Sequence, residues 1–256
     1  MSALRLGRID ESFYQVVGGV VAGVLRRYGH DVAVFDGSHT EIYGALESGD
    51  VDLAVAYWLP YGHAAAWQRL GVAAVELAVL YEGAQFFWAM PAYANDRFLS
   101  IGDLSEPEAS QDVPREIRGL SLDATITTAS QQAVVAYGLE PLGFRVAPGG
   151  FDAWESSLKE AVDMRRPVVL PLWRPYYLNA VFDLRVLADP QGVLGPANRV
   201  ILAARRDARE RIGDAAEQAL RSIGLTLDTV SELDRRVHVD RRSPDYVAHD
   251  WLSTSA

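Results

Sequence analysis

The sequence predicts a two-lobed α/β protein, on three observations. Strand and helix patterns alternate from residue 4 to about residue 60, and the alternation restarts near residue 119. The segment near 85–91 leads from the first run to the second, and the segment near 180–199 leads back. Alternation of this kind is typical of a mainly parallel sheet with helices on both faces. We therefore expect one lobe from residues 1–88 and 190–256, a second from 89–189, and a ligand cleft between them.

The first run of elements is strand, helix, strand. Residues 4–9 are expected to form a strand, and valine and leucine then recur at helical spacing between residues 16 and 25. Ser12 with Gln15 has the pattern of a capping box, whose side chains bond the free amides of a helix start. Further strands are expected at 31–35 and 51–58, separated by a short helix at about 40–48.

The second run repeats this plan. A strand is expected at 120–125, followed by helices that open at Thr128 and Asp152, each with a capping-box pattern. A buried strand at 167–173 comes next. The chain is then expected to form a strand at 198–204, a helix at 208–223 and a final short helix at 243–252.

Composition excludes several classes of protein. The 256 residues are 49% hydrophobic and 23% charged, which fits a globular chain with a core. Apolar runs stay well short of the ~20 residues that cross a bilayer. The net charge of −10 argues against a nucleic-acid partner, and the lack of cysteine excludes disulfides and thiolate chemistry. No secretion signal is visible, so we expect a cytoplasmic protein if the sequence is complete and a periplasmic or cell-surface one if a leader was removed.

Enzyme motifs are missing from the sequence. It contains no G-x-S-x-G elbow, no P-loop and no G-x-G-x-x-G after a strand, and we predict no cofactor. The five histidines are scattered, and His238-x-Asp240, a pair that could ligate a metal, is expected to be solvated. We predict no metal site.

The most informative pattern is a tryptophan that twice precedes a proline by two positions. Trp58-Leu59-Pro60 and Trp173-Arg174-Pro175 each stand at the C-terminal end of a predicted buried strand. Ligands of open α/β sheets bind at such strand ends. An indole face attracts the diffuse charge of a quaternary ammonium by about 0.5–2 kcal/mol per contact. One such tryptophan in each predicted lobe favours an aromatic box for this kind of cation.

At these residues the sequence resembles the glycine betaine/choline substrate-binding proteins of ABC transporters. The first motif is the run 49–63, in which Gly49-Asp50-Val51-Asp52 stands ahead of Trp58-Leu59-Pro60-Tyr61-Gly62-His63. The second motif consists of residues 167–177 and 183–190, and residues 137–139 and 244–252 also match. It implies a type II-like periplasmic-binding-protein fold, a monomer, a small solute as ligand and a membrane permease as partner. It also implies that Trp58 and Trp173 are walls of the box, that His63 contacts a ligand carboxylate, and that backbone amides of the segment 123–128 receive it.

Some residues depart from the family pattern. Some relatives carry a third box tryptophan where this chain has Ala124-Thr125, so Phe13, Tyr14 and Tyr176 are candidate substitutes, with Trp88 and Trp154 as further ones. Asp123 would favour a cation or hydroxyl over a carboxylate. The hydroxyls of Thr125, Thr127 and Thr128 are candidate donors at a helix start, where anions bind well, although Thr128 could serve only as a cap.

Two alternatives stay open at this point. Cytosolic enzymes and solute sensors can be built on the same fold. An enzyme would need titratable groups that converge in the cleft, and the candidates are Asp10, Glu11, His63 and Asp123.

Overall fold

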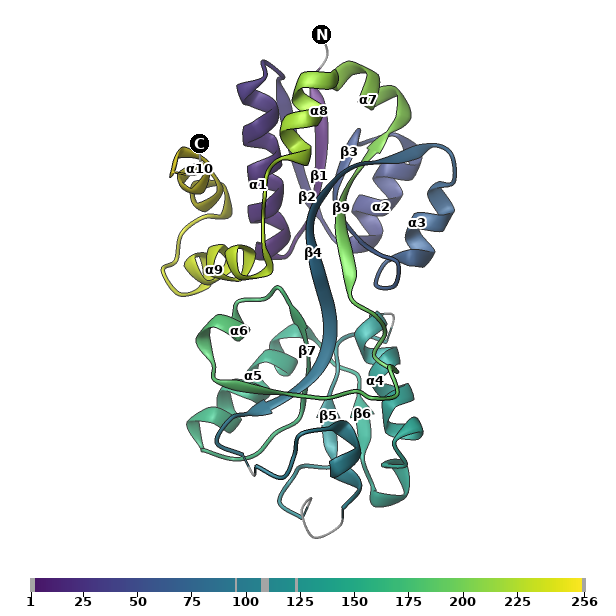
Figure 1. Ribbon diagram of the computed structural model, residues 1–256, viewed down its shortest axis with the longest axis vertical. Coiled ribbons are helices and arrows are strands. Elements are labelled where there is room, and N and C mark those ends of the chain that lie inside the picture. Colours follow the sequence, from purple (N-terminus) through teal and green to yellow (C-terminus); the bar gives the residue numbers. More distant parts are fainter. Residues whose placement is uncertain (1–2, 95, 107–110, 123, 255–256) are drawn as a thin grey trace. The chain divides into compact units, whose positions relative to one another are not determined.

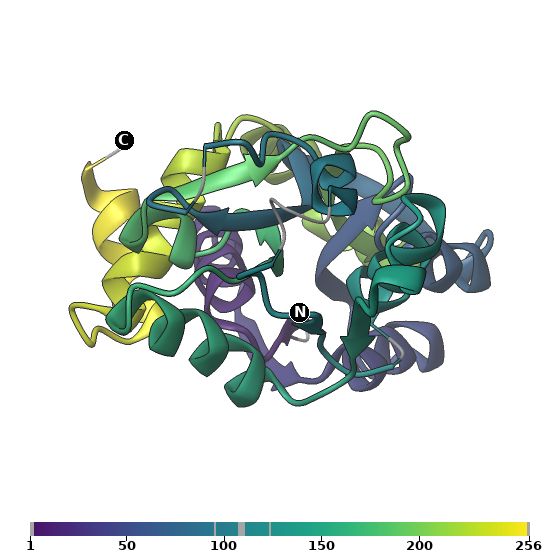
Figure 2. The same cartoon turned by 90° about the horizontal axis from the view of Figure 1, so that it is seen from below.

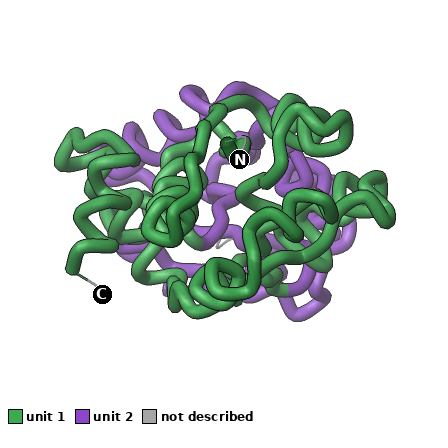
Figure 3. Tube along the Cα trace, turned by 90° about the horizontal axis from the view of Figure 1, so that it is seen from above, with its two compact units in different colours: residues 1–84, 175–181, 197–256 green, residues 85–174, 182–196 purple. Residues whose placement is uncertain are grey.

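The computed structural model describes residues 3–94, 96–106, 111–122 and 124–254, and they form two compact units. Unit 1 contains Met1–Ala84, Pro175–Val181 and Ala197–Ala256, and unit 2 contains Gln85–Arg174 and Phe182–Pro196 (Figure 3). Compared with the lobes expected from the sequence, residues 85–88 and 190–196 belong to unit 2. The segment 175–181, which follows Trp173 closely, belongs to unit 1.

Unit 1 is built on a sheet with strand order β2-β1-β3-β9-β4 (Figure 1). The strands are β1 (Leu4–Ile9), β2 (Val32–Gly37), β3 (Leu53–Leu59), β4 (Ala74–Pro91) and β9 (Asn198–Arg205). β1 pairs in parallel with β2 and β3, whereas β9 runs antiparallel to both β3 and β4. The expectation of a mainly parallel sheet is therefore wrong. β4 and β9 carry the chain out of unit 1 and back into it, so they run in opposite directions.

The long helix α1 (Ser12–Arg27) is packed on several sides in unit 1. Its apolar residues, including Val16, Val17 and Val20, are fully buried. It contacts α8 (Asp214–Arg221), α9 (Leu227–His238) and α10 (Pro244–Thr254), and α9 and α10 lie beside it in Figures 1 and 2. A Cβ at Gly19 would lie 2.7 Å from the Cβ of Ala248. Glycine at this position therefore lets α10 approach closely.

The remaining helices of unit 1 are short. They are α2 (His39–Ser48), α3 (Ala64–Leu70), α6 (Leu178–Val181) and α7 (Arg206–Ile212). The single helix expected at 208–223 is divided into α7 and α8 at Gly213, whose φ of 76° breaks helical geometry. The helix α9 was not expected from the sequence.

All three predicted capping boxes are wrong. α1 begins after Glu11, which makes no capping hydrogen bond, and Ser12 donates its hydroxyl to Asp234 instead. The helices of unit 2 begin at Thr125 and Phe151 without side-chain caps. A true capping box closes the start of α2, where Ser38 and Glu41 bond each other's backbone amides.

A buried carboxylate braces unit 1 at the start of β3. Asp52 is 2% exposed, accepts hydrogen bonds from the backbone and side chain of Arg5, and pairs with Arg211 at 2.7 Å. Burial by itself would raise the pKa of Asp52, but the hydrogen bonds from Arg5 and the charge of Arg211 lower it below its ordinary value.

Unit 2 is built around the second half of β4. There β4 pairs antiparallel with β7 (Leu170–Arg174) and β8 (Leu184–Leu187), and β5 (Glu116–Arg118) pairs in parallel with β6 (Arg145–Ala147). Its helices are α4 (Thr125–Ala136), α5 (Phe151–Asp163) and the 3₁₀ turns η1 (Ile101–Ser105) and η2 (Glu140–Leu142). Trp88, Phe98 and Phe144 are among the residues of its core. The strand expected at 120–125 is wrong, because the strand lies earlier, at β5, and residue 125 already begins α4.

Candidate functional site

Trp58 lies one residue before the end of β3, as the sequence predicted, and the turn that follows is held in place. The Trp58 amide donates to Nδ1 of His63 at 3.0 Å, and the His63 amide donates back to the Trp58 carbonyl at 2.9 Å. Asn198 of β9 accepts from the amides of Tyr61 and Gly62 at 2.8 and 3.0 Å. The position of Trp58, which is 1% exposed, is therefore fixed on both sides of the turn.

His63 belongs to a cluster of rings at this end of the sheet. Its ring centre lies 5.2 Å from that of His39, 5.4 Å from that of Tyr43 and 6.1 Å from that of Trp58. Burial, and then the neighbouring His39, lower the pKa of His63 well below its ordinary value. Because Nδ1 accepts from Trp58, the proton of the neutral ring is assigned to Nε2, which can donate to a ligand oxygen.

Three more rings in unit 1 meet where α1 begins. Phe13 and Tyr14 have ring centres 4.0 Å apart, and Tyr176 meets Phe13 edge to face at 6.1 Å. All three are at most 3% exposed. The structure thus brings together three of the five candidate substitutes that the sequence suggested for the missing tryptophan.

Trp173 is the aromatic residue at the end of β7 in unit 2. Its indole stacks on that of Trp154 with centres 4.9 Å apart and planes 19° apart, and Phe151 meets it at 6.4 Å. Trp154 is fixed in turn, because its Nε1 donates to the carbonyl of Pro171 at 2.8 Å. Trp154 therefore supports Trp173, whereas Trp88 lies in the core of unit 2 and donates to Ser130.

The threonines near the start of α4 have separate roles. Thr127 is fully buried and its hydroxyl accepts from the amide of Leu120 at 2.9 Å, so it stabilises the turn ahead of the helix. Thr128 is exposed and donates to the carbonyl of Thr125 at 3.0 Å. Thr125 is the first residue of α4, and Asp123 lies outside the described residues.

Glu11 is a titratable group that the sequence could name only as a catalytic candidate. Its carboxylate lies 3.8 Å from Nδ1 of His39, at the margin of the ring cluster. Burial, with the nearby charges of Asp234 and Asp10, raises the pKa of Glu11 to about 7. Asp10 instead accepts from the side chain of Gln15.

The Glu11 carboxyl should make unit 1 more stable at mildly acidic than at neutral pH. A carboxyl whose pKa is higher in the folded state stabilises the fold below about pH 4.5, and that contribution is lost as the pH rises to about 7. We expect Glu11→Gln to remove this fall and to raise the free energy of unfolding at pH 7.5 by about 1–3 kcal/mol. Urea denaturation from pH 5 to 8 measures it. The control is Glu41→Gln, at an exposed carboxylate whose pKa is lowered; this variant should keep the wild-type dependence of unfolding free energy on pH between pH 5 and 7. If Glu11→Gln also kept the wild-type pH dependence, the expectation would be contradicted.

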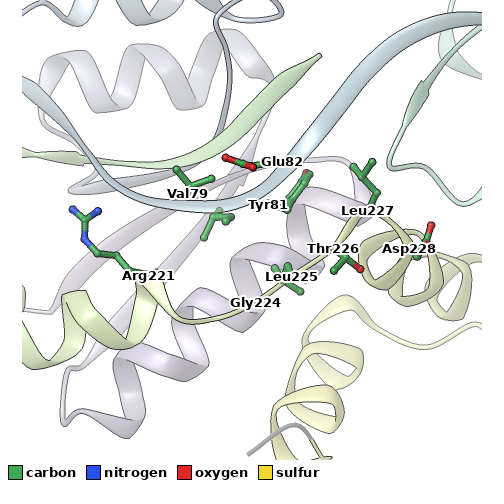
Figure 4. Close-up of a pocket in the computed structure, with 10 residues that line it drawn as sticks. Val79, Tyr81, Glu82, Arg221, Gly224, Leu225, Thr226, Leu227 and Asp228 are labelled. Atoms are coloured by element: carbon green, nitrogen blue, oxygen red, sulfur yellow. The ribbon is translucent and has the colours of Figure 1, made fainter. Parts of the chain in front are cut away.

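A hollow of about 560 Å³ elsewhere in unit 1 includes none of the predicted site residues. It lies between β4 and the chain that leads into α9, as Figure 4 shows. Its rim carries Glu82, Asp228 and Arg221, charges of both signs on an open surface. Tyr81 is the one aromatic residue among those that line the hollow, whereas several rings gather around Trp58 and around Trp173.

Comparison with known proteins identifies the family. Residues 2–254 match the model of the substrate-binding domain of ABC-type glycine betaine transport systems (OpuAC). The chain belongs to this family. It is accordingly a substrate-binding domain and not an enzyme. In the parts of the chain that the structure describes, none of the helices has the length and apolar character of a membrane span.

One curated relative is the glycine betaine/carnitine transport binding protein GbuC of Listeria monocytogenes serotype 1/2a (strain 10403S). It is 26% identical over 151 residues, which are 59% of this chain and 50% of GbuC. The match thus spans half the length of that relative.

Solved structures agree with this assignment in fold. Lactococcal OpuAC in its closed form with glycine betaine has a TM-score of 0.84 at 21% identity, covering 100% of this chain and 96% of that one. ProX of Borrelia burgdorferi, a glycine betaine/L-proline-binding protein, gives 0.81 at 20% identity, covering 99% and 93%. A choline-binding protein of an ABC transporter in complex with choline gives 0.79 at 19% identity, covering 99% and 88%. The fold is the mixed α/β fold of periplasmic binding proteins.

Proposed function

We propose that this chain captures a small quaternary-ammonium solute of the glycine betaine, choline or carnitine class for import by an ABC transporter. Membership of the family supports the transport role. The ligands named for GbuC, lactococcal OpuAC and the choline-binding protein support the class of solute.

The observation that carries the proposal is the position of Trp58 and Trp173. Each stands at the end of a buried strand and is packed against further rings, His63 for Trp58 and Trp154 for Trp173. A quaternary ammonium has no N–H to donate, so aromatic faces bind it better than hydrogen-bond acceptors do. We therefore assign the ammonium to these two indoles, with Phe13, Tyr14 and Tyr176 as further ring contacts.

The other end of the solute needs hydrogen-bond donors. Nε2 of the neutral His63 is one, and the first amides of α4, at Thr125, are others, because a helix N-terminus favours anions. The amides of Thr127 and Thr128 already donate to the Ala124 carbonyl, so these two residues would offer only their hydroxyls. Asp123 belongs to the proposed set as the residue that would favour a hydroxyl over a carboxylate.

The proposed partner is the membrane permease of an ABC transport system, and the proposed place of action is outside the cytoplasm. Membership of the family supports both proposals. A monomer would be sufficient, because all the proposed contacts come from one chain.

Titration of the intrinsic tryptophan fluorescence tests the proposal. Wild-type protein is titrated with glycine betaine, choline, carnitine and proline betaine, and we expect a saturable change with at least one of them. The control is 3,3-dimethyl-1-butanol, which has the shape of choline without its charge and should bind at least about tenfold more weakly than choline if choline is a ligand. No saturable change with any of the four solutes would refute the assigned class.

A further inference from the structure

Asp234 of α9 is a fully buried carboxylate that bonds two distant segments of unit 1. Its Oδ1 accepts from the hydroxyl of Ser12 at 2.5 Å, and its Oδ2 accepts from the backbone amide of Tyr177 at 2.8 Å. Ser12 opens α1, whereas Tyr177 lies in the segment 175–181. One side chain therefore fixes both segments to α9.

His238, one turn further along α9, contacts the same two segments. Its Nε2 lies 2.7 Å from the Ser12 hydroxyl oxygen, and its ring stacks on that of Tyr177 with centres 3.9 Å apart and planes 8° apart. The hydroxyl proton of Ser12 is donated to Asp234, so Nε2–H of His238 donates to the Ser12 oxygen.

The two segments that Asp234 fixes carry a ring pair of the proposed site. Phe13 directly follows Ser12, Tyr176 directly precedes Tyr177, and the two rings meet edge to face at 6.1 Å. Since the bond to Asp234 uses the amide that joins Tyr176 to Tyr177, it fixes the peptide plane beside the Tyr176 ring.

We propose that Asp234, assisted by His238, is a positioning residue for ligand capture that holds the Phe13 and Tyr176 rings in their binding arrangement. It acts through Ser12 and the Tyr177 amide. Packing alone does not require a charge here, because burying a carboxylate is costly and apolar residues of similar volume often serve as well. A carboxylate offers two acceptor oxygens, which is what an O–H and an N–H from two separate segments need. The inference rests on the proposed function for its ligand.

The test compares two buried aspartates of unit 1. We expect Asp234→Ala to weaken the binding of the tightest solute of the titration panel by about tenfold or more. The matched control is Asp52→Ala, which also removes a buried carboxylate bonded to a backbone amide and a side chain, at the start of β3. It should lower the melting temperature of the ligand-free protein and leave the dissociation constant within about twofold.

Asp234→Asn is the conservative variant. Its amide oxygen can keep the bond from Tyr177, and its NH₂ can donate to Ser12, so we expect an affinity between those of wild type and Asp234→Ala. If both Asp234 variants lower the melting temperature and bind the solute as wild type does, the proposed positioning role is overturned. Asp234→Asn also supplies the measurement if the alanine variant does not fold.

A second measurement needs no ligand. In ligand-free wild-type protein labelled on phenylalanine and tyrosine, the Phe13 and Tyr176 ring protons should give a nuclear Overhauser effect. That effect should be lost in Asp234→Ala and kept in Asp52→Ala, and its persistence in folded Asp234→Ala would overturn the inference. If wild type bound none of the solutes, the proposed function would fail, and this measurement would still decide whether Asp234 positions the rings.

Discussion

Replacing Trp58 by alanine is expected to weaken the binding of a quaternary-ammonium solute at least about tenfold, and replacing Trp173 to do the same. Each substitution removes an indole face that the proposed box presents to the cation. Both indoles are at most 5% exposed, and a cation–π contact is strongest where water is excluded. Isothermal titration calorimetry of each variant against the best wild-type ligand measures the change.

The control for this pair is Trp251→Ala. Trp251 lies on α10 and lines a hollow together with Val24 and Ile223, a hollow that includes none of the rings of the proposed site. Its removal should leave the dissociation constant within about twofold of wild type. If both Trp58→Ala and Trp173→Ala fold and bind as wild type does, the aromatic box is not where the solute sits.

Trp154→Phe is expected to impair both stability and binding. The variant loses the hydrogen bond to the Pro171 carbonyl and most of the stack under Trp173, so we expect unit 2 to lose about 1–3 kcal/mol of stability. Because Trp173 then lacks its support, the solute should bind about fivefold more weakly. Chemical denaturation and calorimetry measure the two effects.

Trp88→Phe is the matched control for that variant. Trp88 is also a buried indole of unit 2 whose Nε1 donates a hydrogen bond, in this case to Ser130. It should cost a similar amount of stability and leave the affinity unchanged. Equal affinities in the Trp154→Phe and Trp88→Phe variants would show that Trp154 does not position Trp173.

The two tryptophans could be placed from the sequence because the signal was local. Apolar runs predicted strands at 51–58 and 167–173, and the structure has β3 and β7 at Leu53–Leu59 and Leu170–Arg174. Since each tryptophan was expected at the C-terminal end of its strand, the prediction of the strand also placed the tryptophan. The supporting stack of Trp154 on Trp173 could not be read in the same way, because it joins residues of a helix and a strand that only the tertiary fold brings together.

The helix α9 shows why the rest could not be predicted. Five of its twelve residues are charged, and two of its buried positions are Ser231 and Asp234, polar residues that are usually exposed. A hydrogen bond to a residue far away in the sequence also explains why the capping box predicted for α1 is wrong. Ser12 and Gln15 have the spacing of a capping box, but the Ser12 hydroxyl bonds Asp234, which is 222 positions away. Such a contact leaves no trace in local periodicity.

The approach of α10 to α1 has a consequence for the order in which the chain folds during synthesis. Arg8, beside α1, forms an ion pair with Asp245 at the start of α10, across 237 positions of sequence. The close contact of Gly19 with Ala248 is similarly remote in sequence. A ribosome delivers residues 85–196, which contain all of unit 2, before α10 exists. Unit 2 can therefore reach its native structure first, while the apolar face of α1 stays uncovered. Unit 1 is completed only when α10 emerges and packs against α1.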